Sequence, residues 1–445
     1  MKAVNKYFFI GLILFYLLQW FSPNKPIYFA SYALLAFFFY LASKDIVRSL
    51  AYTLILSLFS ETTFASSLFK LDPDIGAGYF ITPFTVVTFL LLVSSIRRTT
   101  VAVSSIDWLA VAFLLWNSFL FFLRPHPNTL YGIMSLGEMT IAFLLLRISL
   151  GKKDLFVLPV LLVSMLLFQL AVGLVQFLAG GNIGLLAESV SIEFPFGLTA
   201  IEEEQLYRIS GISGHPNMFA VSLLTLVPYL FLYRNWIFQI VKFLWVIVIF
   251  ATYSRLAWVI GAAQFLYLAL TQKSAGRIKL FSAGIIAVIS LAIFIIISPS
   301  LFTRFETIPE AFDEYGSVGI RKKSAAEAWN LFVQSPLIGV GPNMFLAASS
   351  ESPVTDLFRF GQFSPSQKIH NLFLEIAAET GIVGLLIFLS FVSGVLYLTR
   401  KVNSKVQVLT RIAFIGYLIF AQFHPLFLIP QLRILYLLSA IMMIR

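Results

Sequence analysis

The stretch Lys368-Ile-His-Asn-Leu-Phe-Leu-Glu-Ile-Ala-Ala-Glu-Thr-Gly-Ile-Val-Gly384 joins a long polar segment to an apolar run that can cross a bilayer. His370 and Asn371 lie at the junction, directly before the predicted membrane span. A neutral imidazole at such a boundary can accept a proton from a hydroxyl group near pH 7, which is the task of a general base. The alternative is structural, with His370 capping or orienting the helix that follows it. The rest of the chain bears on this choice.

Apolar segments recur from one end of the chain to the other. The 445 residues are 59% hydrophobic and 12% charged, with a mean hydropathy of +0.90. A soluble protein of this length would carry about 25% charged residues. The composition predicts an all-α polytopic membrane protein, one helical bundle with about 12–14 transmembrane helices and a large outer loop. The predicted helices are 7–21, 27–43, 49–64, 80–96, 106–123, 131–148, 155–178, 216–233, 236–252, 256–271, 279–298, 372–399, 407–423 and 426–443.

The positive charges alternate with the apolar segments. If the N-terminus is cytoplasmic, most Lys and Arg residues of the short loops lie inside, as the positive-inside rule requires. They are Lys44, Arg48, Arg97, Arg98, Lys152, Lys153, Arg234, Lys273, Arg277, Lys279, Arg400, Lys401 and Lys405. Both termini are then predicted to be cytoplasmic. Because the net charge of +10 is spread over these loops and forms no compact basic patch, we do not expect nucleic acid binding.

Four regions follow from this orientation. We expect N-terminal transmembrane helices in 1–178, an outer loop with central helices in 179–298, a large outer loop in 299–370, and C-terminal helices in 371–445. The polar segments 179–215 and 299–370 both lie on the outer side. The first apolar run lacks a small-x-small cleavage site, so we expect an uncleaved first helix.

Several classes of chemistry are excluded by the residues present. The chain contains no Cys, which removes disulfides, thiolate catalysis and iron–sulfur ligation. Gly339-Val-Gly341 lacks the lysine of a nucleotide-binding loop. No two histidines stand at metal-ligand spacing on one helix, and His126 and His424 each precede a proline, which suits a turn. We therefore expect a site that holds no metal and no cofactor.

Two arginines of the predicted outer side are candidates for a site. Arg208 lies in the first long outer segment, close to Asn217 at the start of the next helix, where Pro216 suits the first turn. Arg255 stands between two spans with almost no loop. Burying an arginine at the bilayer centre costs about 2.5–3.5 kcal/mol, so Arg255 should have an anionic partner. The alternatives are that Arg255 snorkels to lipid headgroups and that Arg208 pairs with Glu202, Glu203 or Glu204.

A third arginine, Arg321, opens the segment 321–333. Ala325, Trp329, Phe332 and Val333 recur there at helical spacing, which predicts an amphipathic helix that lies on the membrane surface or caps the bundle. The segment Gly339-Val-Gly-Pro-Asn343 then predicts a turn. The alternative for the basic residues 321–323 is a solvated or lipid-facing cluster.

The order of these motifs resembles that of the O-antigen ligase and polymerase superfamily. Between residues 208 and 384 the chain reads Arg-x-x-Gly…Pro-Asn, then Ser-Arg, then Arg-x7-Trp with Ser-Pro-Leu-Ile-Gly-Val-Gly, and then His-Asn-x-x-Leu-Glu…Thr-Gly-x-x-Gly. Members of this superfamily are bacterial membrane glycosyltransferases that use polyprenyl-diphosphate-linked glycans. The resemblance implies a helical, GT-C-like glycosyltransferase fold.

Carried over residue by residue, the resemblance also implies roles. His370 matches the essential histidine of the family and would be the general base for the acceptor hydroxyl. Arg255 and Arg321 would bind the diphosphate of the donor. The residues that would line the site are Arg208, Asn217 and Asn371. The implied reaction is an inverting, metal-independent transfer of a glycan from undecaprenyl diphosphate on the outer, periplasmic face of the inner membrane.

The sequence leaves the acceptor open. Ligation to lipid A–core and polymerisation of repeat units into a growing polysaccharide compete closely, and transfer to a protein serine is less favoured because no large C-terminal domain is present. A transporter or flippase of lipid-linked sugars is an alternative from another class, and a scaffolding membrane protein is a third. Transporters tend to have repeated halves and charges at the midplane, whereas the charges here concentrate in outer loops. The resemblance makes a flippase or a chain-length regulator plausible as a partner, beside membrane lipid.

Overall fold

The computed structural model describes residues 5–60, 81–96, 103–188, 198–201, 204–271, 317–350, 369–402, 404–424 and 432–444. They form a helical bundle with one short antiparallel hairpin, β1 (Leu198–Ile201) and β2 (Glu204–Tyr207), in which Leu198 pairs with Tyr207. The α-helices are α1 (Lys6–Phe21), α2 (Lys25–Ser43), α3 (Ile46–Ser57), α4 (Pro83–Ser95), α5 (Ser105–Leu123), α6 (Pro127–Ser149), α7 (Leu158–Ala179), α9 (Pro216–Leu226), α10 (Trp236–Ala251), α11 (Arg255–Thr271), α14 (Ser317–Gln334), α15 (Phe345–Ser350), α17 (Leu372–Thr399), α18 (Lys405–Phe420) and α19 (Leu432–Met442). Short 3₁₀ helices are η1 (Lys152–Phe156), η2 (Leu186–Glu188) and η3 (Val227–Leu232).

The predicted all-α polytopic membrane architecture is confirmed. Within the described residues, thirteen of the fourteen predicted segments coincide with helices, which are α1–α7, α9–α11 and α17–α19. The fourteenth predicted segment, 279–298, lies outside the described residues. Among the described residues, five helical segments are long and apolar enough to cross a membrane, and further apolar helices are shorter. The five are Lys25–Ser43, Ser105–Leu123, Pro127–Ser149, Lys152–Ala179 and Leu372–Thr399.

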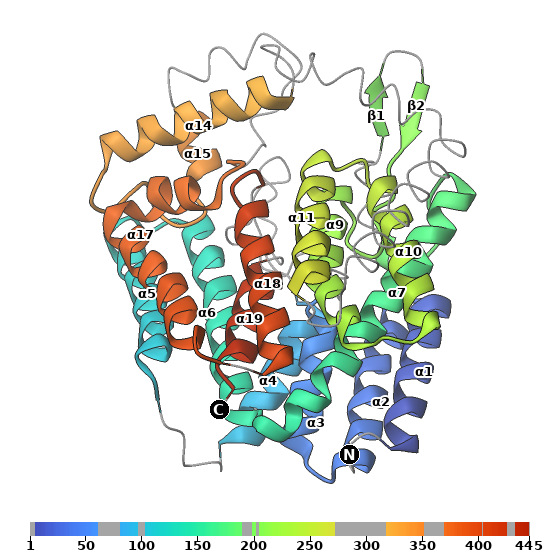
Figure 1. The fold of residues 1–445 in the computed structure, drawn as a ribbon. Helices are drawn as coiled ribbons and strands as arrows, with labels where there is room; N and C mark the ends of the chain where they lie inside the picture. Colours follow the sequence, from blue (N-terminus) through green and yellow to red (C-terminus); the bar gives the residue numbers. More distant parts are fainter. Residues whose placement is uncertain are drawn as a thin grey trace.

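The two ends of the bundle differ. The ends marked N and C both lie at one end, and α14, α15 and the β1–β2 hairpin lie at the opposite end (Figure 1). We call these the inner end and the outer end, after the orientation predicted from the charges. The two polar segments predicted to share one side thus contribute their described parts to the same end of the bundle.

Short polar side chains set the starts of several helices. The side chains of Asn5, Asn24, Asp45, Thr82, Ser104 and Asn235 accept backbone N–H groups in the first turn of the helices that follow them.

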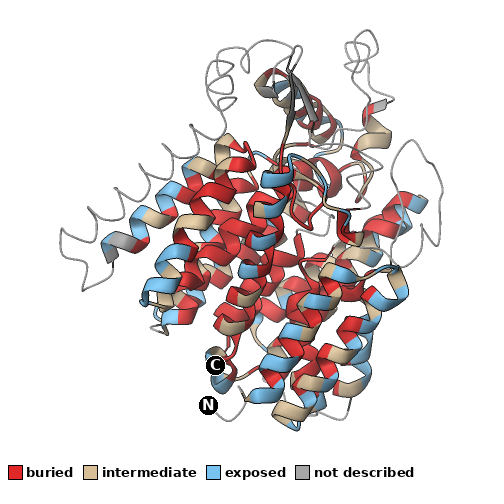
Figure 2. Ribbon diagram, turned by 90° about the vertical axis from the view of Figure 1, so that its right-hand side faces the viewer, coloured by how far each residue is buried: buried red, intermediate tan, exposed pale blue. Residues whose placement is uncertain are grey.

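The interior of the bundle is largely apolar. Buried residues fill the centre, while exposed residues gather on the outward helix faces (Figure 2). Large apolar side chains such as Phe89, Phe122 and Leu178 are among the exposed ones, as expected for faces that contact lipid.

Helix α17 is interrupted near its outer end. Gly381 adopts φ +68° and ψ −176°, which no helix contains, so the carbonyl groups before it need other donors. The backbone N–H of Val340 donates to the carbonyl of Ala378 at 2.9 Å, and the indole of Trp116 donates to the carbonyl of Thr380 at 2.9 Å. The segment that follows α14 is therefore bonded into the gap in α17.

Gly339 and Gly381 allow the two segments to approach each other closely at this junction, and Glu379 binds the start of α15. A Cβ atom on Gly339 would collide with the backbone of Glu379, and a Cβ atom on Gly381 would collide with the backbone of the opposite segment. The Glu379 carboxylate accepts the backbone N–H groups of Asn343 at 2.7 Å and Phe345 at 3.1 Å, where α15 begins. The predicted turn at 339–343 is thus held by both backbone and side chain.

The predicted helix at 321–333 is present as α14, but much of its predicted apolar face points outward. The helix packs on α17, and its buried residues include Gly319, Ser324, Glu327, Ala328 and Leu331. Trp329 and Val333 are 59% and 58% exposed. The small and polar residues between the large apolar ones form the contact with the bundle because they allow close approach of the two helices.

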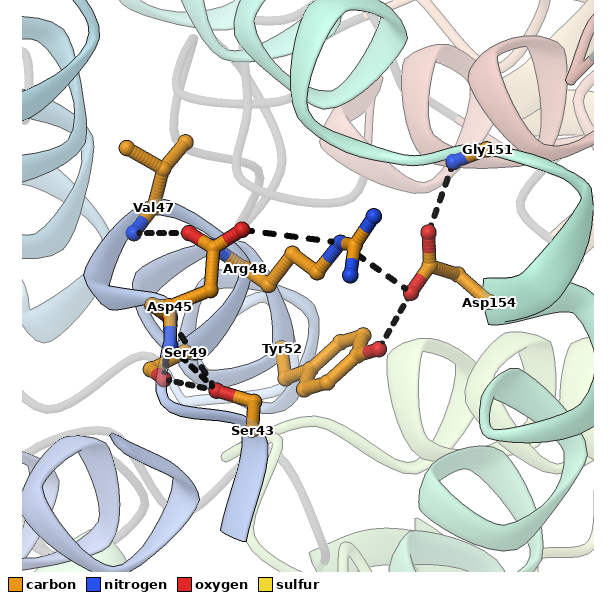
Figure 3. A network of polar contacts seen from close by, with 8 residues as sticks. All are labelled: Ser43, Asp45, Val47, Arg48, Ser49, Tyr52, Gly151 and Asp154. Carbon is orange, nitrogen blue, oxygen red and sulfur yellow. Dashed lines mark hydrogen bonds and ion pairs between the residues drawn. The ribbon is translucent and has the colours of Figure 1, made fainter. Parts of the chain in front are cut away.

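A polar network fixes the inner end of α3 to the segment before α7 (Figure 3). Asp154 accepts a hydrogen bond from the Tyr52 hydroxyl and another from the backbone N–H of Gly151 at 2.7 Å. Arg48 Nε lies 3.8 Å from Asp154 and 3.7 Å from Asp45. Arg48, predicted from its charge to lie inside, therefore also holds two inner segments together.

Two buried ion pairs attach to α6. Arg147 Nε lies 3.1 Å from Asp107 on α5, and Arg433 Nη2 on α19 lies 3.5 Å from Glu138. Gln407 on α18 donates to the carbonyl groups at the end of α19. Because each charge is buried with its partner, these pairs fix the mutual register of α5, α6 and α19.

Candidate active site

Arg208 is buried at the outer end and donates hydrogen bonds to two other parts of the chain. Its Nε donates to the carbonyl of Thr252 at 3.0 Å, and its Nη2 donates to the side-chain oxygen of Asn217 at 3.1 Å. Glu202 and Glu203, two of its predicted alternative partners, lie outside the described residues. Arg208 thereby connects the outer segment before α9 with the turn before α11.

The segment that carries Arg208 is anchored by helix α7. Gln176 donates to the carbonyl of Gly211 at 3.0 Å and accepts the backbone N–H of Gly211 at 2.8 Å. Gly211 has φ +56°, and a Cβ atom there would collide with Phe219. Gln176 also donates to the fully buried Glu188 at 2.6 Å. The Gln176 amide therefore bonds the segment that carries Arg208 to helix α7.

Arg255 is the first residue of α11, directly after the turn that Arg208 holds. Tyr253 in that turn has φ +51°, an uncommon conformation for a residue with a side chain. The Thr252 hydroxyl accepts the backbone N–H of Ser254 at 3.2 Å and donates to the carbonyl of Ile249. Arg255 therefore begins its helix from a fixed turn at the outer end.

Asn371, and not His370, caps α17. The Asn371 side-chain oxygen accepts the backbone N–H of Leu374 at 2.9 Å. Its Nδ2 donates to the carbonyl of Gln422 at 3.3 Å, and the backbone N–H of Leu372 donates to the carbonyl of Ala421 at 2.8 Å. The capping alternative for His370 is therefore wrong, and the start of α17 is bonded to the turn that follows α18.

His215 caps α9 and lies among other titratable groups. Its Nδ1 accepts the backbone N–H of Asn217 at 3.1 Å, and Pro216 occupies the first helical turn as predicted. Burial, together with the charges of Arg208 and His370, lowers the pKa of His215 from 6.5 to about 3. His215 is thus neutral at pH 7, and Arg208 and His370 are its neighbours.

His424 lies in the same cluster, although the sequence indicated only a turn. Its ring stacks on Phe420 with centroids 4.4 Å apart and lies 6.1 Å from the ring of His370. Burial lowers the pKa of His424 well below its ordinary value, and the charges of Arg321, His370, His215 and Arg208 lower it further. Residues from three other outer segments therefore lie near this one imidazole.

Arg321 reaches the cluster from α14. Its guanidinium is largely buried, and this burial lowers its pKa. Arg321 contributes the largest charge effect on His424. The interpretation of residues 321–323 as only a solvated cluster therefore does not hold for Arg321, whereas Lys322 beside it is exposed.

The structure brings most of the predicted site residues together. Arg208 and His370 lie near both His215 and His424, and Arg321 lies near His424. Asn217 binds Arg208, and Asn371 caps the helix next to His370. Arg255 follows the turn held by Arg208. Within the described residues, no group of three His, Cys, Asp or Glu side chains could hold a metal ion. His215 and His424 were missed as site residues; their shared outer location was the signal for them.

One segment in the second half of the chain is similar to a known protein family. Residues 240–389 match the family model described as O-antigen ligase. The matched range contains Arg255, Arg321, His370 and Asn371. No curated protein matches the chain.

Proposed function

We propose that this chain, in which residues 240–389 match the family model described as O-antigen ligase, transfers a glycan from undecaprenyl diphosphate to an acceptor hydroxyl. The observation that carries the proposal is that the ring of His370 lies 6.1 Å from that of His424, while Arg321 and Arg208 lie close enough for their charges to act on His424. These residues come from separate segments at the outer end of a membrane bundle. A scaffolding protein would not need to bury so many imidazoles and guanidiniums in one place.

His370 takes the role of general base. It removes the proton of the acceptor hydroxyl as the acceptor oxygen forms a bond to C1 of the donor sugar. The bond between C1 and the diphosphate oxygen breaks, and its electron pair leaves with the lipid diphosphate. Such a base contributes about 10²–10⁴ in rate. Attack from the face opposite the diphosphate inverts the anomeric centre.

The arginines stabilise the leaving diphosphate. Arg255 and Arg321 bind its oxygens, and Arg208, Asn217 and Asn371 line the site. A planar guanidinium binds phosphate through two N–H groups, and one preorganised donor of this kind is worth about 10²–10³ in rate. The burial of Arg321 supports this role, because a guanidinium held away from water interacts more strongly with an anion. This division of roles uses no cofactor and no metal ion.

The proposed location is the inner membrane. Apolar helices support a membrane location, and the charge pattern of the sequence supports an orientation with both termini in the cytoplasm and the site facing the periplasm. The outward faces, rich in exposed Phe and Leu, suit the long polyprenyl tail of the donor. The lipid-linked glycan therefore reaches the arginines from within the bilayer.

The test is glycan transfer by the full chain in proteoliposomes that contain a polyprenyl-diphosphate glycan donor and excess chelator. Wild type is compared with Arg255→Ala and Arg321→Ala. We expect transfer that survives chelation and falls at least about 100-fold in each arginine variant. Movement of the donor across the bilayer without any transfer would instead identify a flippase.

The same assay separates ligase from polymerase. Donor is supplied alone or together with a lipid A–core acceptor. Product that forms only with lipid A–core identifies a ligase. Lengthening of the lipid-linked glycan with donor alone identifies a repeat-unit polymerase of the same superfamily.

A further inference from the structure

Three histidines of this chain precede a proline at the outer end, and two of them have the same structural task. His126 Nδ1 accepts the backbone N–H of Asn128 at 3.1 Å and caps α6. His215 Nδ1 accepts the backbone N–H of Asn217 at 3.1 Å and caps α9. The third, His424, departs from this pattern. Its ring makes no hydrogen bond within the part of the chain that the structure describes.

The position of His424 is nevertheless fixed. The residue is 3% exposed, and its ring lies nearly parallel to Phe420, with an interplanar angle of 18°. Ala421 and Gln422, directly before it, accept hydrogen bonds from Leu372 and Asn371. The His424 turn and the segment of His370 are therefore bonded to each other. A buried polar ring that is held firmly and makes no hydrogen bond to the described residues points to a ligand.

The distance between the two rings suits one bound oxygen atom. A direct hydrogen bond between two imidazoles places their centroids about 5 Å apart, whereas an oxygen bonded to both separates them by about 6–7 Å. The centroids of His370 and His424 are 6.1 Å apart. We propose that His424 holds the acceptor hydroxyl beside His370 through a hydrogen bond, and so is a second histidine that contacts the substrate. This inference rests on the function proposed above.

The chemistry of the surroundings favours a hydroxyl over a phosphate as the group bound by His424. A neutral imidazole offers one donor and one acceptor, which matches a hydroxyl, while a phosphate oxygen only accepts. Burial and the charge of Arg321 keep His424 neutral at pH 7. In this arrangement the N–H of His424 donates to the acceptor oxygen. The hydroxyl can then donate its proton to His370, and a remaining lone pair of the oxygen can attack C1 of the donor sugar.

The experiment compares His424→Ala and His424→Gln with wild type in the transfer assay. Three quantities are measured: the KM for the acceptor, the affinity for undecaprenyl diphosphate without acceptor, and the Tm. For His424→Ala we expect the KM for acceptor to rise about 10-fold or more, with affinity for undecaprenyl diphosphate within about twofold of wild type. His424→Gln, whose amide can donate and accept, should recover part of the loss. His126→Asn is the control, because it changes the other His-Pro turn and keeps a good cap.

Each other result overturns the inference. An unchanged KM in His424→Ala would show that the ring does not contact the acceptor. Loss of affinity for undecaprenyl diphosphate would assign His424 to the diphosphate. A lowered Tm together with equal loss in both variants would assign it a structural role. Absence of transfer by wild type is a different result, since it removes the proposed function itself.

Discussion

The Nη2 group of Arg208 donates to the side-chain oxygen of Asn217 at 3.1 Å, and this bond couples the first outer segment to the start of α9. Hydrogen bonds to charged groups contribute about 1.5–3 kcal/mol. We expect Asn217→Ala to lower kcat/KM for transfer about 10-fold, because Arg208 is held less firmly. Arg208→Lys should cost at least as much, and the double variant should cost less than the sum. Fully additive losses would contradict the coupling. Asn235→Ala, which removes the cap of α10, is the matched control and should leave kcat/KM unchanged.

The break in α17 makes Gly381 sensitive to any side chain. Gly381→Ala would place a Cβ atom against the carbonyl of Leu337 at a positive φ, so we expect it to lower the free energy of unfolding by more than about 1 kcal/mol. Gly137→Ala is the control, because its Cβ atom would meet only Leu114 at 3.8 Å within a helix. That change should be neutral or stabilising. Thermal unfolding in detergent checks both, and equal Tm values would contradict a close backbone approach at Gly381.

Stability should depend on pH through His215. In the unfolded chain the imidazole has its ordinary pKa of 6.5, whereas the folded protein lowers it to about 3. Between these values only the unfolded state binds the proton, so the free energy of unfolding falls as the pH drops below about 6.5. The contribution is fully present above that pH. His215→Asn keeps a cap and removes the titration, so its Tm should fall less steeply between about pH 6.5 and 4.

The internal control for this prediction is a pH of about 8, where both proteins have an uncharged cap and should unfold at similar temperatures. His424, whose pKa is also lowered, titrates in the same direction, so the slope of the variant should decrease without vanishing. Identical slopes for wild type and His215→Asn would show that His215 is not the source.

The exposed face of α14 should lie in the outer leaflet. On α14, Trp329 and Val333 are 59% and 58% exposed, and Leu337, three residues after the end of this helix, is 64% exposed. The segment after α14 is tied to the end of α5, because Arg124 donates to the carbonyl of Gly339 at 2.9 Å. Phe122, in the last turn of α5, is exposed. This continuity with a lipid-facing helix predicts that the apolar stripe also contacts lipid.

Since the chain has no cysteine, Val333→Cys gives one labelling site. An environment-sensitive fluorophore at position 333 should be quenched by spin-labelled lipids in proteoliposomes. The control is Gln334→Cys, an exposed polar position that lies about 100° further around α14, on the side of Asn330. Its label should remain in water and be quenched less. Equal quenching at both sites, or at neither, would contradict this placement of the helix.

The fold was largely predictable from the sequence because apolar length alone marks a membrane helix. The helices found where predicted needed no tertiary information. The face by which α14 packs was not predictable in this way, since Trp329 and Val333 suit lipid as well as a protein core. The break at Gly381 was also missed. It depends on a distant segment, 336–341, whose backbone replaces the lost helical hydrogen bonds.

The site was predictable in part. Arg208, Arg255, Arg321 and His370 share the outer side, which the charge pattern of the sequence already indicated. His424 was assigned to a turn because a His-Pro dipeptide suits one, as His126 does. Hydrogen bonds between the start of α17 and the turn after α18 bring His424 beside His370, and such contacts between distant segments leave no local sequence pattern.

The most direct test of the central claim, that His370 is the general base of glycan transfer, is a single-turnover measurement. Wild type and His370→Ala are loaded with polyprenyl-diphosphate glycan donor and then mixed with acceptor. We predict that His370→Ala binds donor as wild type does and transfers glycan about 10²–10⁴ times more slowly. Transfer at the wild-type rate by a folded His370→Ala protein would contradict the claim.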